Sequence, residues 1–477
     1  MIGQQFYRLL RDRFPYELTL KQDVFLQKIA EFVTNDKDDQ LFVLKGYAGT
    51  GKTTLLSSVV NELKMINKFA VMLAPTGRAA KVISNYSQRP AFTIHKHIYY
   101  PKPSNSGGGM RYTMRNNRHK NTIFIVDEAS MIGDMSASDS NMYPHGSLLD
   151  DLIYYVYSGI NCKLILIGDS AQLPPVNMQV SPALDIDQLG FQFNMDVQYI
   201  ELDEVMRQEE DSGILYNATE LRSLLDTAFF DTFQFDVKGF KDIVRLVDGY
   251  DIQDAIYSSY SNSGPEETAF IVRSNKRANA YNQQIRARIL DKESEISSGD
   301  LLMVVKNNYY WLKDSTITDF IANGDIIEVL EIYKTIELYG FRFANVRVRM
   351  IDYPDMKSFD TIVLLDTLTS ESPALTYEQQ NYFYQQVMLD YQDEISKYKM
   401  VQKVKENEYF NALQVKFSYA ITCHKSQGGQ WETVFIEQPY LPDGISPEYI
   451  RWLYTAMTRA KDKLYLIGFK DEFFIGE

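Results

Sequence analysis

Short apolar runs alternate with helical patterns along the first part of the chain. The runs occupy residues 41–44, 71–74, 122–126 and 163–167. Before them, residues 18–22 open an amphipathic helix that carries Phe25, Ile29 and Phe32 at helical spacing, with Thr19 placed as the N-cap. Strands that alternate with helices form a parallel sheet covered on both faces. The pattern therefore predicts an α/β fold whose functional groups lie at the carboxyl ends of the strands.

The pattern changes character further along the chain. A second set of strands and helices begins near residue 199. Residues 299–410 open with alternating β-like runs, as in a small barrel, and end in a charged, Tyr-rich helical stretch. The α/β pattern then resumes, so this segment is interpreted as an insertion. We expect a first domain at residues 1–185, a second domain at residues 186–298 and 411–477, and an accessory insertion at residues 299–410.

Composition limits the class of protein. A chain of 477 residues with 45% apolar and 23% charged residues is globular and long enough for two to four domains. No apolar run approaches the roughly 20 residues that span a bilayer, so we expect a cytoplasmic protein with no membrane partner. The two cysteines, Cys162 and Cys423, have no spacing typical of a disulfide framework or a zinc site, and we expect buried thiols.

The charge distribution carries more information than the net charge. A net charge of −14 and a pI near 5.0 argue against a nucleic-acid binder. Residues 91–126, however, contain no Asp or Glu. Basic and aromatic side chains interleave there, namely Lys96, Lys102, Arg111, Arg115, Arg118 and Lys120 with Tyr99, Tyr100 and Tyr112. The stretch is either a basic, aromatic surface for nucleic acid or an exposed loop with a chance charge bias.

A glycine-rich loop between the first strand and a helix fits the pattern G-x-x-x-x-G-K-[ST]. Such a loop directs successive backbone N–H groups at a phosphate, with the positive end of the helix dipole behind them. Lys52 would neutralise β- and γ-phosphate oxygens, and Thr53 would hold Mg²⁺. The expected nucleotide-binding residues are Gly46, Ala48, Gly49, Thr50, Gly51, Lys52, Thr53 and Thr54.

Further polar groups follow the next strands. Asp127 and Glu128 end the run at residues 122–126, where Asp127 would complete the Mg²⁺ shell and Glu128 would activate the attacking water. Gln172 follows the fourth run and is placed to sense the γ-phosphate.

The last α/β segment carries groups suited to phosphates. Thr422, His424 and Lys425 form a helix-start cluster that fits phosphodiester oxygens. Arg459 fits a transition-state phosphate, and an arginine supplied by a second domain would couple hydrolysis to domain movement.

Taken in order, these blocks resemble superfamily 1 DNA helicases of the RecD/Dda group, which move 5′ to 3′ on single-stranded DNA. The resemblance rests on residue 22 and on residues 46–53, 74–81, 93–95, 127–131, 168–175, 207–208, 422–428 and 454–461. It covers most of both α/β parts and implies two RecA-like P-loop domains with parallel sheets. It also implies a small insertion at about residues 97–120 that carries a duplex-splitting pin, and an SH3-like β-barrel insertion within residues 299–410.

The resemblance also implies roles for single residues. Gln22 would read adenine, Arg207 and Arg459 would contact the γ-phosphate, and Gly428 would join the nucleotide-binding set. The implied strand-contacting residues are Pro75, Thr76, His95, Thr422, His424 and Lys425. His95 by itself reads as a satisfied polar group, and its place in the motif favours a strand contact. Tyr99, Tyr100 or Tyr112 would stack on bases or pack in a core. One departure is Gln430, where many relatives carry a Glu.

We therefore expect a monomeric, ATP- and Mg²⁺-dependent DNA helicase that acts on single-stranded DNA and forked duplex DNA. Two alternatives stay open at this stage. The chain would otherwise be a nucleotide-gated single-strand binding or remodelling module that hydrolyses ATP without separating duplexes, or an RNA-directed helicase, because strand contacts that mostly touch phosphate do not distinguish DNA from RNA.

Overall fold

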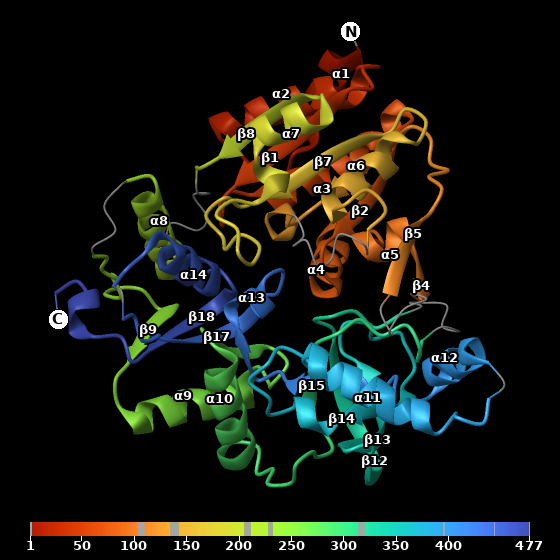
Figure 1. The fold of residues 1–477 in the computed structure, drawn as a ribbon. Coiled ribbons are helices and arrows are strands. Elements are labelled where there is room, and N and C mark those ends of the chain that lie inside the picture. The colour runs from red at the N-terminus through yellow and green to blue at the C-terminus, as the bar shows by residue number, and fades with distance from the viewer. Residues whose placement is uncertain are drawn as a thin grey trace.

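Two parallel sheets and a closed barrel make up the protein in the computed structural model (Figure 1). The structure describes residues 2–103, 110–133, 143–204, 211–227, 232–312, 320–394, 396–442 and 444–476. The first sheet runs from red to yellow in Figure 1, the second combines green and blue segments, and the barrel is teal to light blue. Within these residues, no helix combines the length and the apolar character needed to cross a membrane.

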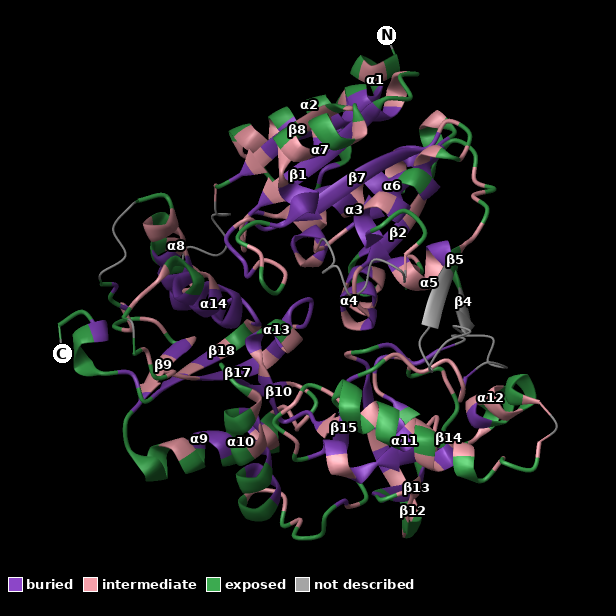
Figure 2. Ribbon diagram, in the orientation of Figure 1, coloured by how far each residue is buried: buried purple, intermediate pink, exposed green. Residues whose placement is uncertain are grey.

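The first sheet has the strand order β3-β2-β6-β7-β1-β8, and all its pairs are parallel. Its strands are β1 (Gln40–Gly46), β2 (Phe69–Ala74), β3 (Ala91–Thr93), β6 (Thr122–Val126), β7 (Lys163–Gly168) and β8 (Asp196–Leu202). β6 and β7 are buried along their whole length, as Figure 2 shows for β7. Their apolar side chains on both faces explain why each reads as a continuous apolar run, and the predicted parallel sheet is confirmed.

Helices cover both faces of this sheet. One face packs against α1 (Ile2–Arg13), α2 (Leu20–Thr34), α3 (Lys52–Glu62) and α4 (Gly77–Ser87). The other packs against α5 (Ile94–Ile98), α6 (Leu148–Tyr157) and α7 (Ile186–Phe193). Thr19 caps α2 by accepting a hydrogen bond from the Gln22 backbone N–H, and the Gln22 side chain accepts one from the Thr19 N–H. This capping box explains why the helix begins where the sequence predicts it.

The first sheet extends past the boundary that we expect at residue 185. β8 pairs with β1 along its whole length, from Gln40 opposite Asp196 to Gly46 opposite Leu202. β8 is an edge strand that is only partly buried, and a short apolar run at an edge does not reveal which of two sheets it joins. The first half of the molecule, as used below, therefore ends at Leu202.

The second sheet has the order β16-β10-β17-β18-β9 and is also parallel. Its strands are β9 (Ile243–Leu246), β10 (Thr268–Val272), β16 (Ala420–Thr422), β17 (Trp431–Glu437) and β18 (Ala460–Ile467). Its helices are α8 (Gly213–Leu225), α9 (Gly249–Asn262), α10 (Asn275–Arg288), α13 (Cys423–Ser426) and α14 (Pro447–Met457). α8 and α14 pack on one face, and α9 and α10 on the other. This sheet and its helices form the second half.

A closed five-stranded barrel is inserted into the second half, as the sequence predicts. Its strands are β11 (Leu301–Val304), β12 (Ile326–Leu338), β13 (Phe341–Met350), β14 (Phe359–Leu364) and β15 (Leu413–Phe417). The Tyr-rich stretch forms α11 (Tyr377–Leu389) and α12 (Lys397–Glu406) on its outside. β15 lies beyond the expected end at residue 410 and closes the barrel by pairing with β11 and β14. β15 leads directly into β16, so one apolar stretch of sequence contributes a strand to the barrel and a strand to the second sheet.

A two-stranded hairpin projects from the first half toward the barrel (Figure 1). It consists of β4 (Tyr99–Pro103) and β5 (Met110–Met114), and it falls within the insertion expected at residues 97–120. Tyr99 is buried at its base, where its hydroxyl donates to Asp151 Oδ2 at 2.6 Å, so the core-packing interpretation applies to Tyr99. Tyr100 is exposed and lies under the Arg115 guanidinium. The Tyr112 side chain lies outside the described residues.

Candidate functional site

The glycine-rich loop between β1 and α3 has the geometry of a phosphate-binding loop. Gly49 and Gly51 adopt φ values of 74° and 78°, a region that favours glycine. A side chain on Gly46 would press against Lys52, with its Cβ 2.9 Å from Lys52 Cδ. Lys52 Nζ donates to the carbonyl oxygens of Gly46 and Tyr47, each at 2.7 Å. The three glycines therefore let the loop close around the lysine ammonium group.

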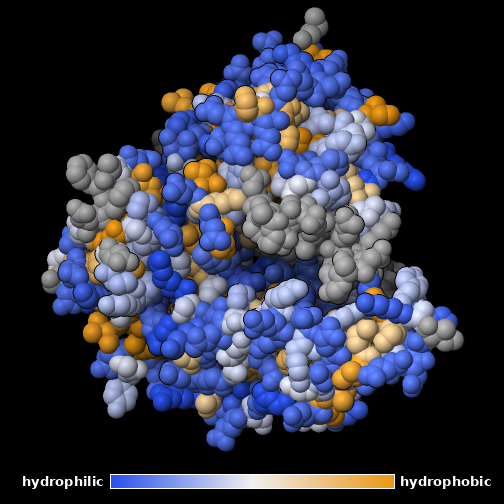
Figure 3. Space-filling view, in the orientation of Figure 1, coloured by the Kyte–Doolittle hydropathy of each residue, from blue (hydrophilic) through white to orange (hydrophobic). Residues whose placement is uncertain are grey.

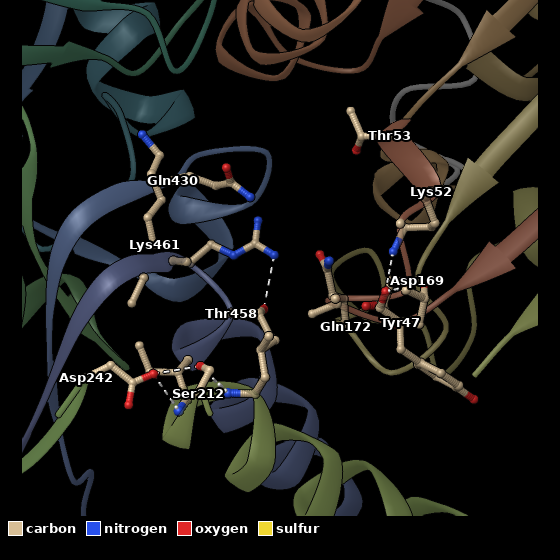
Figure 4. A pocket seen from close by; sticks show the side chains of 18 of the residues that line it. Tyr47, Lys52, Thr53, Asp169, Gln172, Ser212, Asp242, Gln430, Thr458 and Lys461 are labelled. Carbon is tan, nitrogen blue, oxygen red and sulfur yellow. Dashed lines mark hydrogen bonds between the residues drawn. The ribbon is translucent and has the colours of Figure 1, made fainter. Parts of the chain in front are cut away.

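A cleft of about 930 Å³ separates the loop from the second half. The first half contributes residues 47–54, Asp127, Glu128, Asp169 and Gln172, and the second half contributes Ser212, Asp242, Gln430, Thr458, Arg459 and Lys461. Figure 4 shows Lys52, Thr53 and Gln172 on one side of this space and Gln430, Thr458 and Lys461 on the other. The volume of the cleft falls within the range of about 300–1,000 Å³ that is common for ligand pockets.

The acidic pair at the end of β6 lies at the base of the cleft. Asp127 Oδ1 accepts a hydrogen bond from the Glu128 backbone N–H at 2.8 Å, and Glu128 adopts a left-handed φ of 53°. This conformation is unfavourable for a residue with a side chain, and such strain is common at functional sites. Burial raises the pKa of both carboxyl groups, and the positive charge of Arg459 opposes the rise for Glu128.

Arg459 joins the two halves across the cleft. Its Nη1 lies 3.9 Å from Glu128 Oε1, and its Nε donates to the Thr455 carbonyl oxygen at 3.0 Å. Its Nη1 also donates to the Gly429 carbonyl oxygen at 3.4 Å. The guanidinium group is almost fully buried, and its hydrogen bonds to the second half orient it beside Glu128.

Gln172 offers a direct test of whether a polar ligand fits the cleft. Its side chain is buried, and its Oε1 has no hydrogen-bond partner among the described residues. A buried amide oxygen without a partner is costly. Because an amide oxygen accepts hydrogen bonds, this atom fits a donor such as a water molecule. Lys52 together with the Thr53 and Asp127 oxygens fits a phosphate-bearing ligand with a divalent cation.

Gln22 and Gly428, two of the expected nucleotide contacts, are not among the described residues that line the cleft. Gln22 is buried, and its amide donates to the Thr50 carbonyl oxygen at 3.0 Å, so it supports the loop from behind. Gly428 packs against Thr76 and Ala79 at the start of α4. Arg207 lies outside the described residues.

The expected strand-contacting residues lie on three segments, at the start of α4 (Pro75 and Thr76), around α13 (Thr422, His424 and Lys425) and on α5 (His95). Thr76 caps α4 by accepting from the Ala79 N–H, and Arg78 stacks over the Trp431 ring at 4.0 Å. Pro75 precedes Thr76 and is half-buried. A second hollow, of about 650 Å³, lies between α4, β3 and residues 352–355 of the barrel. Figure 3 shows a largely hydrophilic face that is hollowed between the first half and the barrel.

The two histidines differ in their surroundings. His95 Nε2 lies 2.8 Å from the Tyr143 hydroxyl, and burial lowers the His95 pKa to about 4. His95 is therefore a neutral, hydrogen-bonded ring at neutral pH, as expected for a satisfied polar group. His424 is exposed beside the half-buried Thr422, and partial burial lowers its pKa as well. The downward shift of both pKa values disfavours a positive charge on either ring.

A loop of the barrel that sequence reasoning missed, residues 323–325, contacts Lys425 of α13 and the start of α4. Asn323 Oδ1 accepts from Lys425 Nζ at 2.6 Å. Asp325 is fully buried, and a side chain on Gly77, at the start of α4, would overlap the Asp325 carboxylate. Burial and the charge of Asp352 raise the Asp325 pKa to about 8. The sequence signal was the Asn323-Gly324-Asp325 turn, which by itself indicates only a bend.

The chain matches two family models, an AAA domain over residues 26–224 and a UvrD-like helicase C-terminal domain over residues 417–467. Uncharacterized protein R530 of Acanthamoeba polyphaga mimivirus is 22% identical over 93% of this chain and 98% of that protein.

Two further relatives are named as DNA helicases. The ATP-dependent RecD2 DNA helicase of Deinococcus radiodurans is 31% identical over 29% of this chain and 16% of that protein. The ATP-dependent DNA helicase dda of Enterobacteria phage T4 is 25% identical over 60% of this chain and 62% of that protein. The matches therefore span less than two thirds of these two proteins. Among solved structures, the Pif1 helicase from Bacteroides in complex with ADP-AlF3 and ssDNA aligns with a TM-score of 0.48 and 16% identity, over 97% of this chain and 95% of that one.

Proposed function

Since this chain belongs to the superfamily 1 DNA helicases of the RecD/Dda group, we propose that it is an ATP-dependent helicase that moves 5′ to 3′ on single-stranded DNA and separates duplexes. The observation that supports this proposal most is the cleft shared by both halves, with Lys52 on one side and the Arg459–Glu128 pair bridging it. One nucleotide in that space contacts both halves, so its binding and release change how they sit against each other.

ATP binds with its phosphates against the loop. The backbone N–H groups from Gly49 to Thr53 surround the phosphates, and Lys52 leaves its two loop carbonyls to contact β- and γ-phosphate oxygens. Thr53 and Asp127 would hold Mg²⁺, which would supply charge neutralisation at the phosphates. Gln172, whose amide oxygen lacks a partner among the described side chains, orients toward the γ-phosphate and its attacking water.

Hydrolysis uses the Glu128 carboxylate and the Arg459 guanidinium, which lie close together in the cleft. Glu128 accepts a proton from the water that attacks the γ-phosphate, and its raised pKa makes it a better base than an exposed carboxylate. Arg459 moves from Glu128 to the transferring phosphoryl group, where charge develops in the transition state. Arg207 is proposed as a second arginine at the γ-phosphate, on the basis of its motif.

The strand crosses the second hollow and the surface beside it. On the basis of their motifs, Pro75 and Thr76 from the first half and Thr422 and Lys425 from the second contact backbone phosphates, and His95 and His424 are assigned to the strand in the same way. As the cleft opens and closes, the two sets alternate in affinity and the strand advances. The hairpin of β4 and β5 stands at the end of this path as the pin.

A forked DNA with a 5′ single-stranded tail tests the proposal, with a 3′-tailed duplex and an RNA strand of the same sequence as comparisons. We expect ATP-dependent separation of the 5′-tailed duplex alone and stronger stimulation of hydrolysis by DNA than by RNA. Hydrolysis stimulated by DNA without separation would support the remodelling module. Greater stimulation by RNA would support the RNA-directed helicase, and separation from a 3′ tail would reverse the polarity.

A further inference from the structure

The phosphate loop is held from the opposite half by one buried hydroxyl group. The Ala48 backbone N–H donates to the Tyr454 hydroxyl at 2.9 Å, and that hydroxyl donates to Asp169 Oδ2 at 2.7 Å. Tyr454 lies on α14 of the second half, whereas Ala48 and Asp169 belong to the first. The other Asp169 oxygen accepts from the Ala171 N–H at 2.9 Å. A single side chain of the second half therefore connects the loop after β1 with the loop after β7.

Burial makes this connection specific. Tyr454 is 1% exposed, and its ring packs with Ala171 of the first half and Ala218 of α8, with Tyr47 and Ala48 against them. Burial and the Asp169 charge raise the Tyr454 pKa well above its ordinary value, so the hydroxyl keeps the proton that it donates. No water is needed to complete the relay, because both hydrogen bonds are direct.

A second contact reaches the same loop from the second half. The Arg222 guanidinium of α8 lies over the Tyr47 ring at 4.1 Å, and the Tyr47 hydroxyl donates to Glu201 Oε1 at 2.7 Å. Tyr47 also supplies one of the two carbonyl oxygens that hold Lys52. The backbone segment that positions the phosphate-binding lysine is thus fixed by two helices of the other half.

We propose that Tyr454 is a positioning residue that transmits the movement of the second half to the phosphate loop and to the Gln172 loop, and so couples strand binding to nucleotide turnover. The inference rests on the proposed function, because it assumes that a strand moves the second half. Tyr454 and Arg459 are on the same α14–β18 segment. Any shift of that segment therefore changes the Arg459–Glu128 contact and the Ala48–Tyr454–Asp169 relay together.

Tyr454→Phe removes the relay and keeps the packed ring. The matched control is Tyr449→Phe on the same helix, because the Tyr449 hydroxyl is buried and has no hydrogen-bond partner among the residues that the structure describes. The measurement is steady-state ATP hydrolysis with and without a single-stranded DNA oligomer, over a range of ATP concentrations.

We expect Tyr454→Phe to lower the ratio of stimulated to unstimulated kcat by about tenfold, the size expected for losing a hydrogen bond to a charged group. KM for ATP should change less than this ratio, since Lys52 and the loop N–H groups remain. Tyr449→Phe should behave like the wild type. A merely structural role would lower both rates together and leave the ratio unchanged, and that result would overturn the inference.

A second variant covers the case in which Tyr454→Phe does not fold. Arg222→Gln removes the cation over Tyr47 from a partly exposed position and should lower the same ratio, whereas Arg222→Lys should retain more of it. An unchanged ratio in Arg222→Gln would then overturn the inference. Failure of the proposed function looks different, because the wild type itself would show no stimulation by the strand.

Discussion

Asp325 gives the prediction whose magnitude follows most directly from the structure. Its carboxyl group is fully buried between the barrel and the start of α4, and its pKa is raised from 3.8 to about 8. The Asp352 carboxylate adds to the rise, while the Ala322 N–H and Lys96 oppose it. The folded protein therefore keeps a proton on Asp325 at neutral pH that the unfolded chain has lost.

The sign and size of the effect follow from this difference. Below pH 4, Asp325 is protonated in both the folded and the unfolded protein, so its burial does not make the free energy of unfolding depend on pH. Between pH 4 and pH 8 only the unfolded state releases the proton, so the free energy of unfolding falls by about 1.4 kcal/mol for each pH unit. From pH 5 to pH 7.5 the loss is about 3 kcal/mol. Asp325→Asn cannot ionise, and its oxygen can still accept from the Ala322 N–H at 2.7 Å, so the variant should lack this slope.

The assay is urea unfolding of the wild type and of Asp325→Asn at pH 5 and pH 7.5, followed by tryptophan fluorescence. Trp311 reports on the barrel, because its indole N–H donates to the Asn411 carbonyl oxygen at 2.8 Å. The control is Asp355→Asn in the neighbouring exposed loop, which should keep the wild-type pH dependence. Equal slopes for the wild type and Asp325→Asn would refute the reasoning, as would a variant that is less stable at both pH values.

Three further predictions concern the cleft and the hairpin. Lys52→Ala should reduce ATP hydrolysis to background while circular dichroism stays unchanged, because the two hydrogen bonds of the lysine go to carbonyl oxygens of the loop that it serves; normal phosphate release would contradict the site. Glu128→Gln should bind a fluorescent ATP analogue but turn over at least about 100-fold more slowly, and undiminished hydrolysis would exclude it as the base. Replacing residues 101–112 by two glycines keeps the Arg115 and Asn117 anchors and should spare strand-stimulated hydrolysis while reducing duplex separation; equal loss of both would mean that the hairpin grips the strand.

Local spacing made part of this site predictable. The phosphate loop is one continuous segment, so residues 46–53 indicate it without any knowledge of the rest of the chain. The acidic pair follows the same logic, because Asp127 and Glu128 come directly after a fully buried strand. The parallel sheets and the barrel follow from apolar periodicity alone, and the fold prediction is confirmed at that level.

Contacts between distant segments account for what the sequence could not reveal. Ala48 and Tyr454 are 406 positions apart, and no periodicity links a buried hydroxyl to a backbone N–H across that distance. The expected boundaries place β8 outside the first domain and β15 outside the barrel insertion. The reason is that a short apolar run does not indicate which strand it pairs with. The sequence around Asp325 predicts only a turn, and the contact of Asp325 with Gly77 arises from the fold. The role of Arg207 stays a prediction.

The affinity for a single-stranded DNA oligomer, measured with and without a non-hydrolysable ATP analogue, tests most directly whether both halves share one nucleotide. A site that spans the halves must couple the two ligands, and such coupling is typically about 5- to 150-fold. We predict at least a fivefold change in the strand Kd for the wild type and a much smaller change for Arg459→Ala, which removes the contact with Glu128. A strand affinity that stays the same while the analogue is bound would contradict the account.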